Sequence, residues 1–285
     1  MKDGFCRISF LLLSILLTAP AAADPAALKA LVAKKAGVVE LLHGKAERAL
    51  VTAAQDKTFT KYFEAQTDEE RARLRDRIGE ISLAVQKQFA VEEMCLINRQ
   101  GAEISRIVGK QIAYDLSTQE AQTVFFAPAF AQAPRTVYRS PIYISPDAHR
   151  WVTAYATPIL IDGEKKAILH YEHGLDFYEH TVNAGLSTSD HRVLVTMTKE
   201  GWVIFDSRKD IPIEQVKGSD NPADYFAKFS LDGLSFEDIK KAIGAEGSEG
   251  SGNVVASGGK SYDVAFKEAG YWTLIAFEPA QPKPT

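Results

Sequence analysis

The first part of the chain has the spacing of apolar residues that is typical of amphipathic helices. Apolar residues recur every three or four positions over Leu28–Leu50, which predicts one long helix. A second apolar stripe covers Leu74–Phe89, and it follows Thr67 and Glu70, which have the spacing of a helix-capping box. Residues 24–90 are therefore predicted to form an N-terminal helical region.

After this region the pattern changes to short runs that are typical of β-strands. The first two runs are joined by a turn in which Gly101 occupies a position that requires a positive φ angle. Ser117 and Glu120 form another capping box, which predicts a short helix through Phe130. Two strands are predicted before this helix and three after it: Met94–Asn98, Glu103–Val108, Thr136–Ile144, Arg150–Ile161 and Lys166–His173. Residues 91–185 are thus expected to form one module, an antiparallel sheet flanked by helices.

The same order of elements returns in residues 186–278, which predicts a second module. Its predicted strands are Arg192–Thr198, Trp202–Asp206, Asn253–Ser257, Ser261–Lys267 and Tyr271–Phe277, and its predicted helices are Asn221–Phe229 and Ser235–Ala242. The glycine-rich stretch Gly244–Gly252 is expected to be a flexible loop, and residues 279–285 a disordered tail. The predicted fold class is α+β: a long N-terminal helix and two modules, each with about five antiparallel strands.

Residues 1–23 have the three-part pattern of a secretory signal peptide. Lys2 and Arg7 precede an apolar run, and the small residues Ala21-Ala22-Ala23 follow that run at once. The run is shorter than the roughly 20 residues that a transmembrane helix needs, although an uncleaved anchor is the alternative interpretation. We therefore expect a periplasmic or secreted protein.

Charge and cysteine content narrow the choice of partners and of stabilising bonds. The formal net charge of −4 argues against a nucleic-acid partner, which favours a basic surface. Cys95 is the only cysteine after the predicted signal peptide, so no internal disulfide is expected. Cys95 follows Met94 in an apolar run, and we interpret it as a buried core residue.

Four stretches, in this order of elements, resemble the double-Cache family of extracytoplasmic sensor domains: Leu96–Ile104, Asp115–Phe130, Ser140–Asp147 and Trp151–Pro158. The resemblance spans nearly the whole chain after residue 23. It implies PAS-like modules, a small-molecule ligand in the first module, a second module that relays the change, and a homodimer through the N-terminal helix. Family members carry a membrane anchor and a cytoplasmic output module, which this sequence does not show. We therefore expect a separate membrane partner, either a receptor kinase or a transporter.

The resemblance also suggests where the ligand binds. In the amino-acid-binding branch of the family, an arginine just before an aromatic pair holds the ligand carboxylate. Thr123 stands at that position here, before Phe125 and Phe126, which weakens the case for an amino-acid ligand. Tyr143 matches a tyrosine of the family, and Glu172 falls where the family has an aspartate that receives the ligand amine.

Aromatic residues near Glu172 complete the predicted site. The candidate ligand-binding residues are Phe125, Phe126, Tyr143, Trp151, Tyr155, Tyr171 and Glu172. A carboxylate among aromatic rings suits an organic cation, so an amine or another nitrogenous metabolite is the expected ligand. Core packing of the aromatic residues is the alternative, and an ion pair with Arg139 or Arg150 would make Glu172 purely structural.

The histidines near Glu172 raise the alternative of a metal site. His170 and His173 point to opposite faces of a strand and cannot share an ion, so we interpret them as solvated surface residues. A helical turn that starts at His173 would instead bring His173, Asp176 and His180 onto one face as metal ligands.

Short pieces of serine-enzyme motifs also occur. Residues 219–221 and 257–260 look like parts of the penicillin-recognising enzymes, but in reverse order and in turns. We therefore expect no enzyme, no cofactor and no metal. A periplasmic scavenger that feeds a transporter and a ligand-free structural dimer remain as alternatives.

Overall fold

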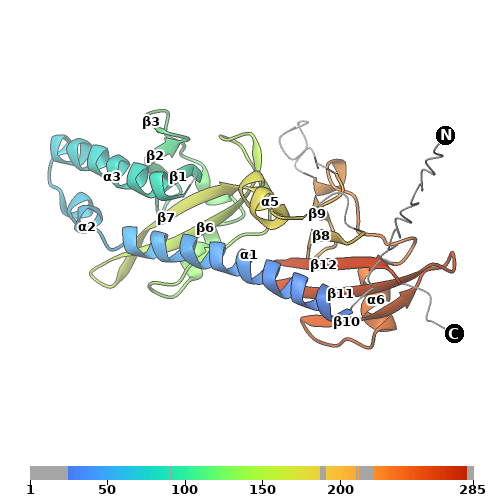
Figure 1. Ribbon diagram of the computed structural model, residues 1–285. Helices are drawn as coiled ribbons and strands as arrows, with labels where there is room; N and C mark the ends of the chain where they lie inside the picture. The colour runs from blue at the N-terminus through green and yellow to red at the C-terminus, as the bar shows by residue number, and fades with distance from the viewer. Residues whose placement is uncertain (1–24, 90, 187–190, 210, 212–220, 281–285) are drawn as a thin grey trace, which may run out of the picture.

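The computed structural model describes residues 25–89, 91–186, 191–209, 211 and 221–280. The predicted signal peptide and residues 281–285 of the predicted tail lie outside these residues. Two antiparallel sheets lie one after the other along a single long helix, α1 (Pro25–Ala53), which contacts both of them (Figure 1). Among the described residues, no helix has the length and apolar character needed to cross a membrane.

Three helices form the N-terminal region. The apolar stripe of α1 is buried, from Leu28 to Leu50, as its spacing predicted. A short helix, α2 (Lys57–Glu64), precedes α3 (Asp68–Gln88). The Thr67 hydroxyl accepts a hydrogen bond from the backbone N–H of Glu70, so the predicted start of this helix is confirmed.

Sheet A, the sheet of the first module, has the strand order β3-β2-β1-β7-β6-β4, and β5 also pairs with β6. Its strands are β1 (Val91–Asn98), β2 (Glu103–Val108), β3 (Gln111–Ala113), β4 (Tyr138–Arg139), β5 (Tyr143–Ser145), β6 (Arg150–Ile161) and β7 (Glu164–Gly174). Gly101 has a φ of 86°, as predicted for the turn between β1 and β2. A Cβ there would lie 2.5 Å from the backbone nitrogen of Ala121, so this turn requires glycine.

Two predictions between β3 and β6 were wrong. The predicted helix through Phe130 is divided into a single 3₁₀ turn, η1 (Glu120–Gln122), and a short helix, α4 (Phe126–Ala131). The Ser117 hydroxyl accepts from the backbone N–H of Gln119 and does not cap a longer helix. The predicted strand Thr136–Ile144 is interrupted between β4 and β5 because Pro141 has no N–H for the strand ladder.

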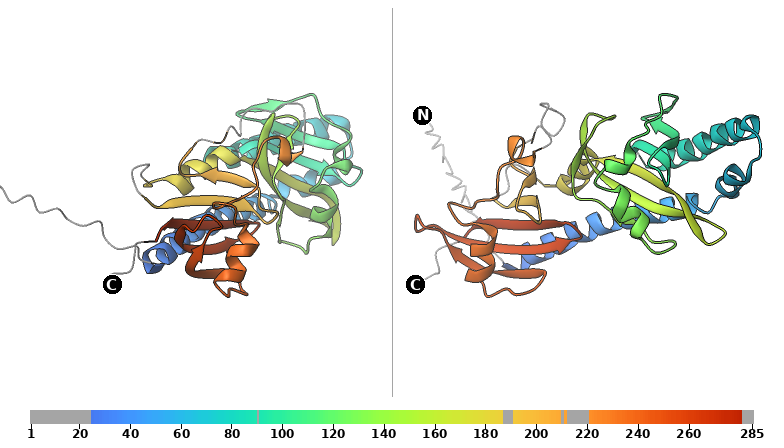
Figure 2. Two further views of the ribbon diagram at one scale, coloured as in Figure 1. Left: turned by 90° about the vertical axis from the view of Figure 1, so that its right-hand side faces the viewer. Right: turned by 180° about the vertical axis from the view of Figure 1, so that it is seen from behind.

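The two faces of sheet A are covered by different parts of the chain. We call the side that packs against α1, α3 and α5 (Leu175–Asn183) the helix face. The opposite side, which we call the segment face, packs against α4, in the stretch 114–149 that also supplies the edge strands β4 and β5 (Figure 2). Side chains alternate between the faces along each strand, so Tyr155 and Tyr171 lie on the helix face and His170 and Glu172 on the segment face.

Sheet B, in the second module, has the strand order β10-β11-β12-β8-β9. Its strands are β8 (Val193–Thr198), β9 (Val203–Asp206), β10 (Glu249–Val255), β11 (Ser261–Ala269) and β12 (Trp272–Pro279). The predicted helix Asn221–Phe229 is only a 3₁₀ turn, η2 (Pro222–Asp224). The predicted helix at Ser235 is confirmed as α6 (Phe236–Ala242), with a complete capping box of Ser235 and Asp238.

The predicted glycine-rich loop is in part a strand. Its last residues, from Glu249 to Gly252, belong to β10 and pair with β11. A Cβ on Gly250 would lie 2.7 Å from the Phe266 ring, and a Cβ on Gly252 would lie 2.8 Å from Ile243. These glycines therefore allow close packing and do not mark a flexible loop.

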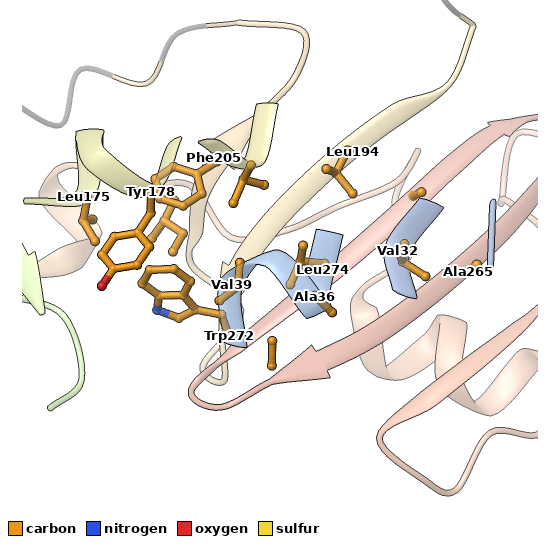
Figure 3. Packing of buried hydrophobic residues seen from close by; sticks show 14 of the residues in the cluster. Val32, Ala36, Val39, Leu175, Tyr178, Leu194, Phe205, Ala265, Trp272 and Leu274 are labelled. Atoms are coloured by element: carbon orange, nitrogen blue, oxygen red, sulfur yellow. The ribbon is translucent and has the colours of Figure 1, made fainter. Parts of the chain in front are cut away.

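A continuous apolar core joins the two modules. Val32, Ala36 and Val39 of α1 pack against Leu194, Phe205, Trp272 and Leu274 of sheet B, and Tyr178 of α5 joins this cluster (Figure 3). Trp151 of β6 adds edge-to-face contacts with Tyr225 and Phe226. The first module therefore contributes buried side chains to the core of the second.

Candidate functional site

The segment face of sheet A carries a cluster of buried polar side chains. They are Glu93, Cys95, Glu103, Arg106, Ser145, His170 and Glu172, with the ring of Tyr143 beside them. Two pairs of residues lie directly opposite one another on the neighbouring strands β1 and β7, Glu93 with Glu172 and Cys95 with His170. Because directly opposite residues point to the same face of a sheet, this register gathers acidic, thiol and imidazole groups at one place.

Glu172 forms the part of the cluster that the sequence predicted. Tyr143 donates a hydrogen bond to its Oε1 over 2.5 Å, while its Oε2 accepts none from the described residues. Burial raises the pKa of Glu172, although Tyr143 and the nearby Ser145 act in the opposite direction. Burial therefore favours the neutral form of this side chain more than water does.

His170 lies between Glu172 and an aromatic ring. The Phe125 ring stacks on the imidazole with centroids 3.8 Å apart, and Nε2 of His170 is 3.8 Å from Oε1 of Glu172. Nδ1 is buried and has no hydrogen-bond partner among the residues that the structure describes. Burial lowers the pKa of His170 to about 3, so the ring is neutral at physiological pH and does not balance the charge of Glu172.

Two further carboxyl groups converge on Cys95. Its Sγ lies 2.9 Å from Oε1 of Glu93 and 3.0 Å from Oε1 of Glu103. Burial, reinforced by the neighbouring Glu172, raises the pKa of Glu93 to about 9. Burial also raises the pKa of Glu103 and that of the Cys95 thiol.

Arg106 is the one basic residue in ion-pair contact with this cluster in the described part of the chain. Its guanidinium lies 3.8 Å from Glu103, but it approaches Asp115 at 2.8 Å and Asp147 at 2.9 Å. The buried carboxyl groups of Glu93 and Glu172 have no such ion pair there. The cluster therefore has more acidic groups than its own cations can balance, and protons or a bound cation must supply the difference.

The predicted binding residues do not all lie at this cluster. Phe125, Tyr143 and Glu172 lie together, and Phe126 packs beside them in the apolar layer beneath α4. Trp151, Tyr155 and Tyr171 are buried on the helix face and are not brought together with Glu172. The reason is the two-residue period of a strand, because Tyr171 directly precedes Glu172 and must point to the other side of the sheet.

The structural alternative for Glu172 was wrong. Arg139 pairs with Glu47 at 2.7 Å, and Arg150 pairs with Glu92 at 3.1 Å and with Asp176 at 3.4 Å. Neither arginine reaches Glu172, so its carboxyl group is not neutralised by the partners that the sequence suggested.

The interpretation of the histidines was right about geometry and partly wrong about exposure. His170 and His173 lie on opposite faces of β7, as predicted, but both are buried, and only His180 is exposed. His173 contacts the Tyr178 hydroxyl at 3.0 Å, and Asp176 pairs with Arg150. The alternative metal site of His173, Asp176 and His180 does not form in the described structure.

Sequence reasoning missed Glu93 and Glu103 and assigned Cys95 only to the core. Cys95 is buried, as predicted, but its neighbours are carboxyl groups. Glu93 and Cys95 are two positions apart on a strand, which was a signal that they share a face. The proximity of Glu103 depends on the pairing of β1 with β2, where the register shifts between Leu96 and Ile97.

Open cavities lie elsewhere on the molecule. One of about 390 Å³ lies between α1, α2 and the end of β6, where Asp56, Phe59 and Arg135 contribute to its wall. Another, of about 260 Å³, lies in the second module beside Arg208 and Lys228. Neither is lined by a member of the buried polar cluster.

Comparison with known proteins identifies the fold. No family model and no curated protein matches the sequence. The sensory domain of the Campylobacter jejuni chemoreceptor Tlp3 with isoleucine bound superposes with a TM-score of 0.69 at 11% identity, covering 90% of this chain and 92% of that one.

Sensor domains of two other bacteria give similar results. The domain of a putative sensory box/GGDEF family protein from Vibrio parahaemolyticus has a TM-score of 0.62 at 12% identity, covering 90% of this chain and 96% of that one. The sensor domain of the V. cholerae histidine kinase DctB has a TM-score of 0.58 at 12% identity, covering 90% and 98%. The expected α+β fold with two PAS-like modules is confirmed, and the fold of this chain is that of the Cache-type extracellular sensor domains.

Proposed function

We propose that this chain is an extracytoplasmic sensor-type domain that binds a small organic cation, an amine or another nitrogenous metabolite, on the segment face of its first module. The observation that carries the proposal is Glu172, a buried carboxyl group with Oε2 free of hydrogen bonds from the described residues. An ammonium group that donates to Oε2 would satisfy this atom and would balance the charge that burial disfavours.

The surroundings of Glu172 favour a cation over an anion. Glu93 lies directly opposite on β1, and the nearest ring nitrogen belongs to a neutral histidine. The Thr123 hydroxyl, which stands where amino-acid-binding relatives have an arginine, donates to the backbone oxygen of Glu120. A ligand carboxylate would therefore meet acidic groups and, among the described residues, no guanidinium free of a carboxylate partner.

Aromatic rings supply the rest of the binding surface. Phe125 and Tyr143 lie 6.2 Å apart between ring centroids, Tyr143 donates to Glu172, and Phe126 packs in the same apolar cluster as Phe125. Their faces attract ammonium groups, which adds to the charge–charge attraction. Because α4 packs on this face, we propose that α4 and the residues flanking it move to admit the ligand and that their position reports occupancy.

The signal would pass to a separate membrane partner of the receptor-kinase type. Similar folds occur in the sensor domains of a chemoreceptor and a histidine kinase, which supports a sensory role. The core that joins Trp151 and Tyr178 of the first module to sheet B offers a path for the change. The apolar stripe of α1 packs on the sheets of its own chain, and a homodimer through α1 stays a prediction.

The test is a thermal-shift screen of the purified protein against amines and against carboxylates of similar size. A ligand that binds only the folded state raises the melting temperature. At a ligand concentration of 100 times Kd, it stabilises the folded state by about 2.7 kcal/mol. We expect an amine to raise it in the wild type and in Glu164→Gln, an exposed position on the same strand. Glu172→Gln keeps an acceptor for Tyr143 but removes the charge, and it should lose the shift.

Two outcomes would contradict the proposal. A shift with carboxylates alone would reverse the sign of the ligand charge. An amine shift that persists in Glu172→Gln, with the variant shown to be folded by circular dichroism, would place the ligand elsewhere.

A further inference from the structure

We propose that Glu93, Cys95 and Glu103 form a binding site for a divalent transition-metal ion of the Zn²⁺ type, next to the proposed amine site but separate from Glu172. The three residues come from the adjacent strands β1 and β2, and all are buried. One side-chain donor atom from each lies within 4.8 Å of the other two. This convergence on the segment face is the first step of the argument.

The hydrogen bonding inside this group needs either a proton on a carboxyl group or a cation. Sγ of Cys95 lies 2.9 Å from one carboxyl oxygen and 3.0 Å from the other, but a thiol carries a single hydrogen. It cannot donate to Glu93 and Glu103 at once. A metal ion among the three atoms would replace this shared hydrogen, because the thiol and both carboxyl groups act as ligands in their deprotonated forms.

The local charges match a divalent ion. Two carboxylates and a thiolate would carry three negative charges, and Arg106 lies 3.8 Å from the Glu103 carboxyl group. A divalent cation would balance two of these charges, and the guanidinium, which also pairs with Asp115 and Asp147, would offset part of the third. Buried charges need this kind of compensation, and a monovalent ion would leave a negative charge buried.

His170 is an independent observation that points to a ligand. Its side chain is 2% exposed, and Nδ1 has no hydrogen-bond partner among the residues that the structure describes. The residue lies directly opposite Cys95 on β7, on the same face of the sheet. A neutral imidazole with an unpartnered nitrogen, directly opposite Cys95, is a candidate fourth ligand.

The donor types choose among metals. One sulfur, one nitrogen and two oxygens are ligands of Zn²⁺, which takes four of them in tetrahedral geometry. A thiolate disfavours Mg²⁺ and Ca²⁺, which prefer oxygen ligands alone. Co²⁺ accepts the same donors and absorbs light when it is bound to a thiolate, so it is the probe of choice.

The experiment is a titration of the purified protein with Co²⁺, followed by the charge-transfer absorption of a cobalt–thiolate bond in the near ultraviolet. We expect a saturable band that Zn²⁺ abolishes by displacement. Cys95→Ser should remove the band, and Glu103→Gln should weaken binding by at least about 10-fold. Glu164→Gln, at an exposed position on β7, is the control and should keep the band.

The outcomes separate this site from the amine site. Absence of the band in the folded wild type, or its persistence in folded Cys95→Ser, overturns the metal site. Glu172→Gln should keep the cobalt band and lose the thermal shift with the amine. Cys95→Ser should lose the cobalt band and keep the thermal shift. Either proposal can therefore fail while the other stands.

Discussion

The two faces of sheet A bury polar groups in opposite ways. On the helix face, hydrogen bonds link His43, Tyr155, Tyr178 and His173 in a chain, with 2.5 Å between the two tyrosine hydroxyls. Burial lowers the pKa of His43 to about 2 and that of His173 to about 3, so both rings are neutral and the chain carries no net charge. The network joins α1, β6, β7 and α5.

The segment face has acidic groups in excess and incomplete hydrogen bonding. Burial raises the pKa of Glu93, Glu103 and Glu172, and Arg106 is the one basic residue in ion-pair contact with them among the described residues. The helix face also has buried atoms without a partner among the described residues, namely Trp151 Nε1, the Tyr171 hydroxyl and His173 Nε2, but these groups are neutral, whereas the unmatched acidic groups of the segment face need a proton or a ligand. Unbalanced charge therefore marks the candidate binding face better than a high density of aromatic rings.

The largest effect should follow the loss of an aromatic side chain on the helix-face side. Trp151 is 1% exposed and contacts Tyr225 and Phe226 edge to face. Trp151→Ala should lower the free energy of unfolding by about 3–5 kcal/mol, measured by denaturant titration. Tyr114→Ala, at a side chain that is 79% exposed, should change it by less than about 0.5 kcal/mol. A stable Trp151→Ala that merely weakens ligand binding would return Trp151 to the binding site.

The next largest effect should come from Arg106, the one basic residue in ion-pair contact with the buried polar cluster in the described part of the chain. Arg106 and Glu103 are both buried. Arg106→Gln removes the guanidinium beside the Glu103 carboxyl group, and it should lower the free energy of unfolding by about 3 kcal/mol. Arg77 pairs with Glu80 on the exposed surface of α3, and Arg77→Gln should cost no more than about 0.5 kcal/mol. Equal losses in the two variants would show that the segment face is balanced without Arg106.

The sequence predicted the elements with strong local signals. The alternation along β6 and β7, the glycine turn at Gly101 and the capping box at Ser235 were sufficient for the α+β class. Predictions failed where tertiary contacts decide. Glycine is needed in β10 because the side chains of Ile243 and Phe266 approach the backbone closely, and a local sequence pattern does not reveal these tertiary contacts.

The candidate site was predictable only in part. Glu172 stood out as a carboxyl group within an apolar strand, and its contact with Tyr143 agrees with the resemblance. Tyr171 was assigned beside it, although a strand's two-residue period places the two on opposite faces. The group around Cys95 required the register of three strands, because β1 alone does not reveal that Glu103 and His170 lie beside it.

The smallest expected effect is a pH dependence of the free energy of unfolding, which has opposite signs for the buried histidines of the helix face and the buried carboxyl groups of the segment face. A histidine with a lowered pKa in the folded state binds its proton only after unfolding, so its contribution to stability is present above pH 6.5 and is lost as the pH falls. The loss is about 1.4 kcal/mol per pH unit for each such histidine, down to the folded-state pKa. The carboxyl groups with raised pKa act in the opposite sense, because they lose stability as the pH rises.

The carboxyl groups contribute equally to wild type and to a variant of a helix-face histidine. The difference between their free energies of unfolding therefore reports the histidine alone. Tyr155 and Tyr178 contact His43 by hydrogen bonding or ring packing, Trp272 packs against its ring, and the charge of Arg139 also lowers its pKa. His43→Gln keeps a polar partner for Tyr155 but cannot titrate. The stability of the variant relative to wild type should therefore rise between pH 6.5 and pH 4.5, by about 1.4 kcal/mol per pH unit, in urea titrations at several pH values. A difference that stays constant over this range would mean that His43 is already protonated in the folded protein, and the contrast between the two faces would fail.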